Sequence, residues 1–351
     1  MCTALSFIGG RRFLARNLDH TDSFSEGIAV LPRGYRHPCE IIPTFDSRYA
    51  IVGIASVIDG EPLIFDGMNE HGLAIAGLNL PYSTRLFRRE NIHSAHQTAK
   101  PTSQAKDSNP KERHLIPSFD FMRRILAAFG TVSELRENIS SVSLTDEPPR
   151  IGIPSPTLHY LVSDGVSSLT LEHTDDKITV YDNPLGVLTN EPPFPCQLSR
   201  LESLLPLSPT NPPPRILSDT RISPLSEGLG AVGLPGDFSS PSRFLRAAYI
   251  KEHLPSYSDI SSTRVAIFEL LDAVSIPDGA VDTGGGRFMR TRYSSIMDQS
   301  TLTYLVRTPE CKSTHTLTLT DRLACAPKPL FCPLEATECS RDVTELMSPA
   351  S

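Results

Sequence analysis

Short apolar runs separated by turn residues dominate the first 80 positions of the chain. Runs at 2–8 and 11–16 flank Gly9-Gly10, a two-residue signal that is typical of a β-hairpin. Four further apolar runs, each bounded by Gly, Asp or Pro, predict strands at 27–31, 49–57, 62–66 and 72–80. The first part of the chain is therefore expected to be built from strands.

Helical spacing appears after this region. Apolar residues from Phe119 to Phe129 recur at helical intervals and end at Gly130, and Thr131 with Glu134 has the spacing of a capping box. The same reasoning predicts further helices at 196–205, 242–254 and 262–275. Strands are predicted at 157–163, 168–173, 177–182, 291–297, 301–307 and 314–320. Two blocks of strands, each followed by helices or flanked by them, favour two sheets packed face to face with helices outside.

Three segments lack such periodicity. Residues 88–114 are mostly polar and show no period, which predicts a flexible surface insertion. Residues 206–241 are rich in Pro and Gly, which predicts a long, stiffened excursion. The tail 322–351 is expected to be disordered.

Composition and charge exclude several classes of function. The 351 residues carry a net charge of −7, so no basic field exists to hold nucleic acid. No run of about 18 apolar residues is present, and arginines interrupt the N-terminal segment early, so neither membrane insertion nor a signal peptide is predicted. The seven cysteines are scattered and lack close pairs, which favours free thiols, no metal site and a cytoplasmic location.

Cys2 carries the most chemical information. If Met1 is removed, one residue combines a thiol of ordinary pKa about 8.5 with an α-amine of ordinary pKa about 7.7–8.0. A nucleophile and a base matched near neutral pH can cleave an amide through an acyl-enzyme. A cysteine at position 2 also occurs by chance, so neighbouring residues have to support this interpretation.

The predicted hairpin places candidate partners beside Cys2. Residue 2 is expected to pair with about residue 17, which brings Arg16 and Asp19 next to the N-terminus. Asp19 could orient the α-ammonium, and the fixed charge of Arg16 could lower the thiol pKa. The alternative is a surface ion pair worth about 0–1 kcal/mol.

Two asparagines and one arginine complete the candidate site. Asn79 and Asn190 each end an apolar run, and their amide groups are suited to an oxyanion hole, although asparagine also favours turns. Arg243 lies at the start of a predicted helix, where a cation is unfavourable for the helix dipole, so either a functional role or an exposed side chain fits.

Several of these residues lie in motifs that resemble the choloylglycine hydrolase family, which includes bile salt hydrolases and penicillin V acylases. The resemblance runs in order from Met1 to about Thr320. The motifs are Met1-Cys-Thr, Arg16-Asn-Leu-Asp19, Phe65-Asp-Gly-Met-Asn-Glu-His-Gly72, Ala76-Gly-Leu-Asn79, Tyr181-Asp-Asn-Pro-Leu-Gly-Val-Leu-Thr-Asn190 and Gly233-Leu-Pro-Gly-Asp-Phe-Ser-Ser-Pro-Ser-Arg243.

The resemblance implies an α+β fold of the N-terminal nucleophile hydrolase type: a single domain over 1–321, arranged as a four-layer αββα sandwich with two central antiparallel sheets. It implies Cys2 as nucleophile with its own amine as base, and Asp19 and Arg16 as the pair that orients them. It further implies Asn79 and Asn190 as oxyanion and substrate-positioning residues and Arg243 as an active-site arginine. No metal or organic cofactor is implied.

The resemblance also implies a substrate and an assembly. Asn at position 79 is typical of bile salt hydrolases, whereas penicillin V acylases often have Tyr, so the expected substrates are glycine- or taurine-conjugated bile acids. The Pro-rich loop at about 203–228 resembles the one through which family members form homotetramers. The alternatives are the same chemistry on penicillin V or N-acyl homoserine lactones, and a non-catalytic bile-acid- or lipid-binding protein.

Overall fold

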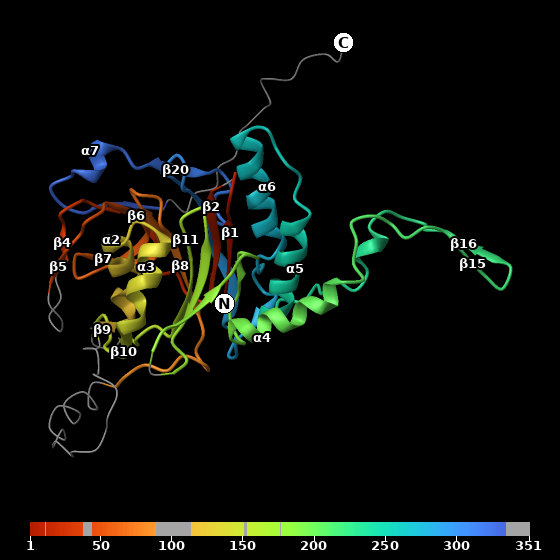
Figure 1. The fold of residues 1–351 in the computed structure, drawn as a ribbon, viewed down its shortest axis with the longest axis horizontal. Helices are drawn as coiled ribbons and strands as arrows, with labels where there is room; N and C mark the ends of the chain where they lie inside the picture. Colours follow the sequence, from red (N-terminus) through yellow and green to blue (C-terminus); the bar gives the residue numbers. More distant parts are fainter. Residues whose placement is uncertain (11, 38–43, 89–113, 151–152, 176, 335–351) are drawn as a thin grey trace, which may run out of the picture.

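The computed structural model describes residues 1–10, 12–37, 44–88, 114–150, 153–175 and 177–334. Two large antiparallel sheets form the centre of this part of the chain (Figure 1). The predicted insertion at 88–114 lies almost wholly outside the described residues.

The first sheet has seven strands, and its strands include the hairpin that carries Cys2, Arg16 and Asp19. In spatial order its strands are β14 (Val187–Leu188), β1 (Cys2–Phe7), β2 (Phe13–His20), β18 (Phe288–Asp298), β19 (Thr303–Arg307) and β20 (His315–Thr318), with β17 (Val281–Asp282) paired to β18. The strand β1 lies between β14 and β2, so this strand is paired on both sides.

The second sheet has eight strands and packs against the first. In spatial order these are β13 (Thr179–Asp182), β12 (Ser168–Glu172), β11 (Leu158–Ser163), β8 (Ala74–Asn79), β7 (Glu61–Asn69), β6 (Ile51–Ile58), β3 (Gly27–Leu31) and β21 (Leu330–Pro333). Three short pairs lie apart: β4 (Arg36–His37) with β5 (Phe45–Asp46), β9 (His114–Pro117) with β10 (Val142–Thr145), and β15 (Arg215–Leu217) with β16 (Thr220–Ile222).

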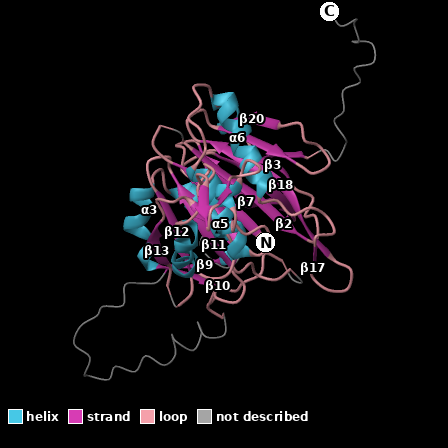
Figure 2. Ribbon diagram, turned by 90° about the vertical axis from the view of Figure 1, so that its right-hand side faces the viewer, coloured by secondary structure: helices cyan, strands magenta, loops and turns pink. Residues whose placement is uncertain are grey.

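Helices cover the outer face of each sheet. The helices α2 (Phe121–Ala128) and α3 (Val132–Asn138) share an apolar cluster with the eight-stranded sheet. The longer helices α5 (Ser240–Glu252) and α6 (Ile260–Ala273) share the other cluster with the seven-stranded sheet. Figure 2, viewed from the side that α5 and α6 cover, shows the strands lying behind them. The predicted four-layer αββα sandwich is confirmed.

Two short helices lie outside these layers, and one of them corrects a prediction. The helix predicted at 196–205 begins earlier, as α4 (Phe194–Leu198), and continues as a 3₁₀ helix over 199–204. The tail predicted to be disordered from 322 is ordered as far as 334: α7 (Asp321–Ala324) precedes β21, which pairs antiparallel with β3. The edge of the eight-stranded sheet supplies free backbone groups for this pairing, which apolar periodicity does not reveal.

The first hairpin turns at Gly9-Gly10 as predicted, with one residue of difference in register. Cys2 pairs with Leu18, and Thr3 pairs with Asn17. Since side chains alternate along a strand, Cys2, Arg16 and Leu18 face the second sheet while Thr3, Asn17 and Asp19 face the helices. The contact between Asn17 Nδ2 and the Leu271 carbonyl oxygen of α6, 2.7 Å, agrees with this.

Two β-bulges interrupt the register close to this hairpin. Arg292 is the extra residue where β18 pairs with β2, because Thr291 pairs with Asp19 and Tyr293 with Leu18. Phe65 is the extra residue where β7 pairs with β6, because Asp66 pairs with Ile54 and Ile64 with Ala55. Bulges of this kind re-aim side chains and free backbone groups.

The cysteines differ in part from the prediction of free thiols. Cys2, Cys196, Cys325 and Cys332 are free, but Cys311 is disulfide-bonded. Sequence spacing offered no close cysteine pair at this position, so the bond could not be predicted. Among the described residues, no helix has both the length and the apolar character to cross a membrane.

Candidate active site

The Cys2 thiol lies between the two sheets and is buried, with 3% of the residue exposed. The Nη2 atom of Arg16 lies 3.3 Å from Cys2 Sγ. Burial would raise the thiol pKa, but Arg16 and the N-terminal ammonium outweigh it, so the pKa of Cys2 is lowered. The thiol is thus held where its anionic form is favoured.

Arg16 is fixed by several contacts on the same side of the sheet. Its Nη1 atom donates to the Phe65 carbonyl oxygen at 2.6 Å, the group freed by the bulge in β7, and to Asp66 Oδ2 at 3.1 Å. Burial opposes the charge on Arg16, but the neighbouring Cys2 thiol and Asp66 carboxylate raise its pKa. Arg16 therefore stays charged.

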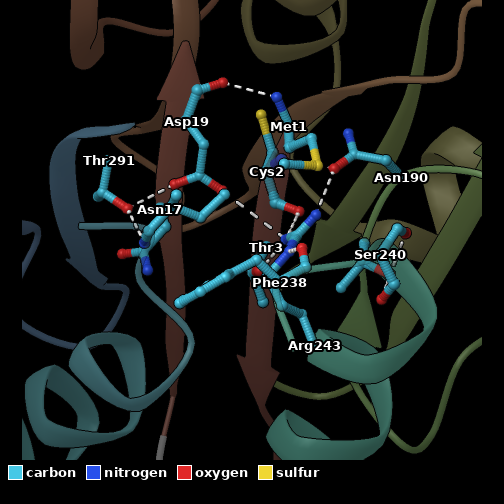
Figure 3. A network of polar contacts seen from close by, with 12 residues as sticks. Met1, Cys2, Thr3, Asn17, Asp19, Asn190, Phe238, Ser240, Arg243 and Thr291 are labelled. Atoms are coloured by element: carbon cyan, nitrogen blue, oxygen red, sulfur yellow. Dashed lines mark hydrogen bonds and ion pairs between the residues drawn. The ribbon is translucent and has the colours of Figure 1, made fainter. Parts of the chain in front are cut away.

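Asp19 and Arg243 form a second buried pair on the helix side of the same hairpin (Figure 3). Their closest atoms, Arg243 Nη1 and Asp19 Oδ2, lie 3.7 Å apart. Thr291 Oγ1 donates to Asp19 Oδ1 at 2.6 Å. Arg243 Nη1 also donates to the Cys2 carbonyl oxygen and to Thr3 Oγ1, each at 2.6 Å. Although burial lowers the pKa of Arg243, the charges of Asp19 and Cys2 act in the opposite direction.

The start of α5 holds Arg243 in place. Asp237 Oδ1 accepts from the Ser239 backbone at 2.9 Å and Asp237 Oδ2 from Ser242 Oγ at 2.6 Å. Hydrogen bonds from these two serines lower the pKa of Asp237 to about 2, as expected for a carboxylate near a helix N-terminus. The Phe238 carbonyl oxygen accepts from Arg243 Nε at 3.1 Å. The unfavourable position of Arg243 in the first turn is thus offset by the Asp19 carboxylate and by the carbonyl oxygens of Phe238 and Cys2.

Asn190 joins the two sides of the site. Its Oδ1 atom accepts from the Cys2 backbone nitrogen at 2.6 Å and from Arg243 Nη2 at 2.8 Å. Its Nδ2 atom donates to the Asn79 carbonyl oxygen at 2.8 Å. The two donors at Oδ1 settle the orientation of the amide. Asn79 is therefore placed by its backbone, and its exposed side chain ends β8 at the edge of the site.

A buried glutamine fixes the backbone of Asn190. Gln197 Nε2 donates to the carbonyl oxygens of Asn190 at 2.5 Å and of Pro192 at 2.8 Å. Gln197 Oε1 accepts from Thr189 Oγ1 at 3.2 Å. This residue was missed in the sequence, where it lies in an unremarkable predicted helix.

Met1 precedes Cys2 in the chain and extends the hairpin by one residue. Its ammonium donates to the Asp19 carbonyl oxygen at 2.6 Å, and its carbonyl oxygen accepts from the Asp19 backbone nitrogen at 2.8 Å. While Met1 is attached, the nitrogen of Cys2 is an amide without basicity. Its removal would turn the same nitrogen, already beside Asn190 Oδ1, into an amine next to the thiol.

The geometry thus brings the predicted residues together at Cys2. Arg16 contacts the thiol, Asn190 and Arg243 contact the Cys2 backbone, Asp19 pairs with Arg243, and Asn79 lies at the edge of the site. That Asp19 orients the amine concerns the processed chain and stays a prediction. In the described part of the chain, no group of three His, Cys, Asp or Glu side chains could hold a metal ion.

Comparison with known proteins places this arrangement in a family. Residues 2–326 match the family described as linear amide C-N hydrolases, choloylglycine hydrolase family. The bile salt hydrolase/transferase of Lactiplantibacillus plantarum is 31% identical over 319 residues, covering 91% of this chain and 92% of that protein. The enzyme of the same name from Clostridium perfringens is 32% identical over 301 residues, covering 85% and 86%.

A solved structure agrees over almost the whole chain. The crystal structure of a mutant conjugated bile acid hydrolase from Clostridium perfringens superposes with a TM-score of 0.85 at 28% identity, covering 98% of this chain and all of that one. Sequence, fold and the cysteine at the start of β1 agree: this chain belongs to the choloylglycine hydrolase family of linear amide C–N hydrolases.

Proposed function

We propose that this chain hydrolyses the amide bond of glycine- or taurine-conjugated bile acids through a thioester on Cys2. Family membership supports amide hydrolysis, and the names of the relatives support this class of substrate. The observation that carries the proposal is the position of Cys2, whose sulfur lies 3.3 Å from a buried arginine and whose nitrogen lies 2.6 Å from Asn190 Oδ1.

Each step of the reaction uses groups of the chain itself. After Met1 is removed, the Cys2 amine takes the thiol proton, and the thiolate attacks the amide carbonyl of the conjugate. The carbon–nitrogen bond breaks, the leaving glycine or taurine nitrogen receives the proton held by the amine, and a bile-acid thioester remains. Water then attacks the thioester and gives a proton to the same amine. The carbon–sulfur bond breaks, and the amine returns that proton to the sulfur.

Asn79 and Asn190 are the groups proposed to stabilise the tetrahedral oxyanion. One hydrogen of Asn190 Nδ2 goes to the Asn79 carbonyl oxygen, which leaves the second hydrogen for a substrate. The Asn79 side chain is exposed at the end of β8 and is available as a second donor. Arg16 stabilises the thiolate of Cys2, and Arg243 holds the Cys2 backbone through its carbonyl oxygen. Asp19 is proposed to orient the α-ammonium of the processed chain.

Substitution of Cys2 tests the proposal. Cys2→Ala removes the nucleophile and is expected to abolish release of taurine from taurocholate, while Cys196→Ala, at an exposed free cysteine, leaves it intact. Taurocholate hydrolysis by a folded Cys2→Ala protein would contradict the mechanism. If this hydrolysis is absent from the wild-type chain too, although conjugates bind and Met1 is removed, the alternative of a non-catalytic binding protein is favoured.

The substrate class needs a separate comparison, since penicillin V or an N-acyl homoserine lactone could undergo the same chemistry. We expect kcat/KM to be highest on glycocholate or taurocholate. Asn79→Tyr, which introduces the residue often found in penicillin V acylases, is expected to move the preference toward penicillin V. A wild-type preference for penicillin V would overturn the role given to Asn79.

We also propose a cytoplasmic homotetramer with a single catalytic domain, which the sequence predicts over 1–321 and which α7 and β21 extend to about residue 334. The four free cysteines among the described residues agree with a reducing compartment, whereas the disulfide at Cys311 is more typical of an oxidising one. The hairpin β15–β16 projects from the body of the protein (Figure 1) and exposes Ile216, Leu217 and Ile222, which supports a role in assembly. Light scattering should give four copies for the wild type and fewer for Ile216→Asp.

A further inference from the structure

A buried carboxylate and two buried phenols lie next to Arg16, on the side away from the thiol. Asp66 is fully buried on β7, in the eight-stranded sheet, yet its carboxylate reaches the seven-stranded one. Its Oδ2 atom accepts from Arg16 Nη1 at 3.1 Å and from the Tyr293 hydroxyl at 2.5 Å. Its Oδ1 atom accepts from Ser295 Oγ at 3.2 Å and from the Tyr304 hydroxyl.

The two tyrosines are donors to this carboxylate under all ordinary conditions. Tyr293 and Tyr304 are each at most 1% exposed. Burial, reinforced by the charge of Asp66, raises the pKa of both phenols well above the ordinary value. Their hydroxyls therefore remain protonated and donate hydrogen bonds to the Asp66 carboxylate. These bonds share its negative charge, which would otherwise attract the Arg16 guanidinium away from the sulfur.

Both β-bulges are needed for this arrangement. The extra residue Arg292 puts Thr291 and Tyr293 on opposite faces of β18. Thr291 can therefore donate a hydrogen bond to Asp19 while Tyr293 donates one to Asp66. The extra residue Phe65 frees the carbonyl oxygen that accepts from Arg16. Without the first bulge, regular alternation would put residues 291 and 293 on one face.

We propose that Asp66, with its charge dispersed by the Tyr293 and Tyr304 hydroxyls, is the positioning residue that holds the Arg16 guanidinium against the Cys2 sulfur. Asp66 touches neither the sulfur nor any group given a catalytic role except Arg16. Its contact with the site is therefore the one to Arg16, and holding that guanidinium is the role proposed for it. The inference rests on Cys2 being the nucleophile of the proposed function, but it is independent of the substrate.

A double-mutant cycle tests this directly on the processed chain that begins with Cys2. The readout is the pH dependence of Cys2 alkylation by iodoacetamide, which requires no bile salt. Asp66→Asn is expected to slow alkylation at pH 7 and to lower kcat/KM by about 10- to 100-fold, a loss typical of groups that orient a reactive partner. In an Arg16→Gln background the same change should have no effect beyond about twofold.

Equal losses in both backgrounds would overturn the proposal, because Asp66 would then act independently of Arg16. A fall in the thiol pKa in Asp66→Asn would also overturn it, since the carboxylate would then only oppose the thiolate charge. Tyr304→Phe is the milder second variant and should raise the thiol pKa in the same direction. An unchanged thiol pKa in folded Tyr304→Phe would overturn the claim that the Tyr304 hydroxyl helps Asp66 to hold Arg16 at the sulfur.

Tyr160→Phe is the matched control for the tyrosine variant. Tyr160 is equally buried, and its hydroxyl has no hydrogen-bond partner among the described residues. Its removal is expected to leave the thiol pKa unchanged. If alkylation behaves as expected but no bile salt is cleaved, the positioning role stands and the proposed substrate fails, so the two proposals are distinguished.

Discussion

Replacing Arg16 by Gln removes the guanidinium charge that contacts the Cys2 sulfur. At the observed 3.3 Å between Nη2 and Sγ, the attraction between guanidinium and thiolate is about 5 kcal/mol at an effective dielectric constant near 20. Asp66, 3.1 Å from Arg16 Nη1, offsets part of this because its charge has the opposite sign. A net shift of about 1–3 pKa units is usual for one adjacent opposite charge, and we expect the thiol pKa to rise by that amount.

The rate should follow the thiolate population. Each unit of increase lowers the thiolate fraction about tenfold at a pH below the thiol pKa, so kcat/KM at pH 7 is expected to fall by about 10- to 1000-fold. The pH profile of iodoacetamide alkylation measures the thiol pKa independently of turnover. Arg136→Gln is the matched control, because Arg136 forms an exposed ion pair with Asp182 on the surface.

The folded state has to be verified for this variant. Arg16→Gln leaves Asp66 without its cationic partner, and breaking a buried pair in this way costs about 3–5 kcal/mol of stability. Arg16→Lys keeps the charge and serves as the second variant, with an expected thiol pKa between those of the wild type and Arg16→Gln. A folded Arg16→Gln protein whose thiol pKa is unchanged or lower would refute the electrostatic role of Arg16.

The remaining predictions concern other parts of the site. Asn190→Ala removes a proposed oxyanion donor and should lower kcat on taurocholate by about 10²–10³-fold; an unchanged kcat would exclude that role. Arg243→Ala leaves Asp19 and the Cys2 carbonyl oxygen unpaired and should destabilise the protein by about 3–5 kcal/mol in thermal or denaturant unfolding, whereas exposed Arg200→Ala should have almost no effect. Incubation with EDTA should leave taurocholate hydrolysis unchanged, and a loss restored by a divalent cation would contradict a metal-free mechanism.

The sequence was sufficient for the layers and for the residues nearest the thiol. Apolar alternation predicted the strands on both sides of Gly9-Gly10, and the hairpin geometry brought Arg16 and Asp19 to Cys2 with one residue of difference in register. These relations are local, since 14 residues separate Cys2 from Arg16. Local turn chemistry and strand periodicity fix them.

The groups behind Arg16 could not be predicted in this way. Asp66 comes from the opposite sheet, and Tyr293 meets it across 227 residues of sequence. Their meeting depends on extra residues at Phe65 and Arg292, and a bulge changes the face of a side chain without changing the apolar pattern enough to be recognised. The tail is likewise ordered to residue 334 because β21 pairs with β3, a strand about 300 residues earlier in the chain.

Mass spectrometry of enzyme mixed with taurocholate and quenched in acid within a turnover can detect the thioester on Cys2 itself. We predict an intact mass that lacks Met1 and carries one added cholyl group, which a digest assigns to the peptide that begins with Cys2 and which is absent in Cys2→Ala. A fully active preparation whose chains retain Met1, or an acyl group attached elsewhere, would contradict it.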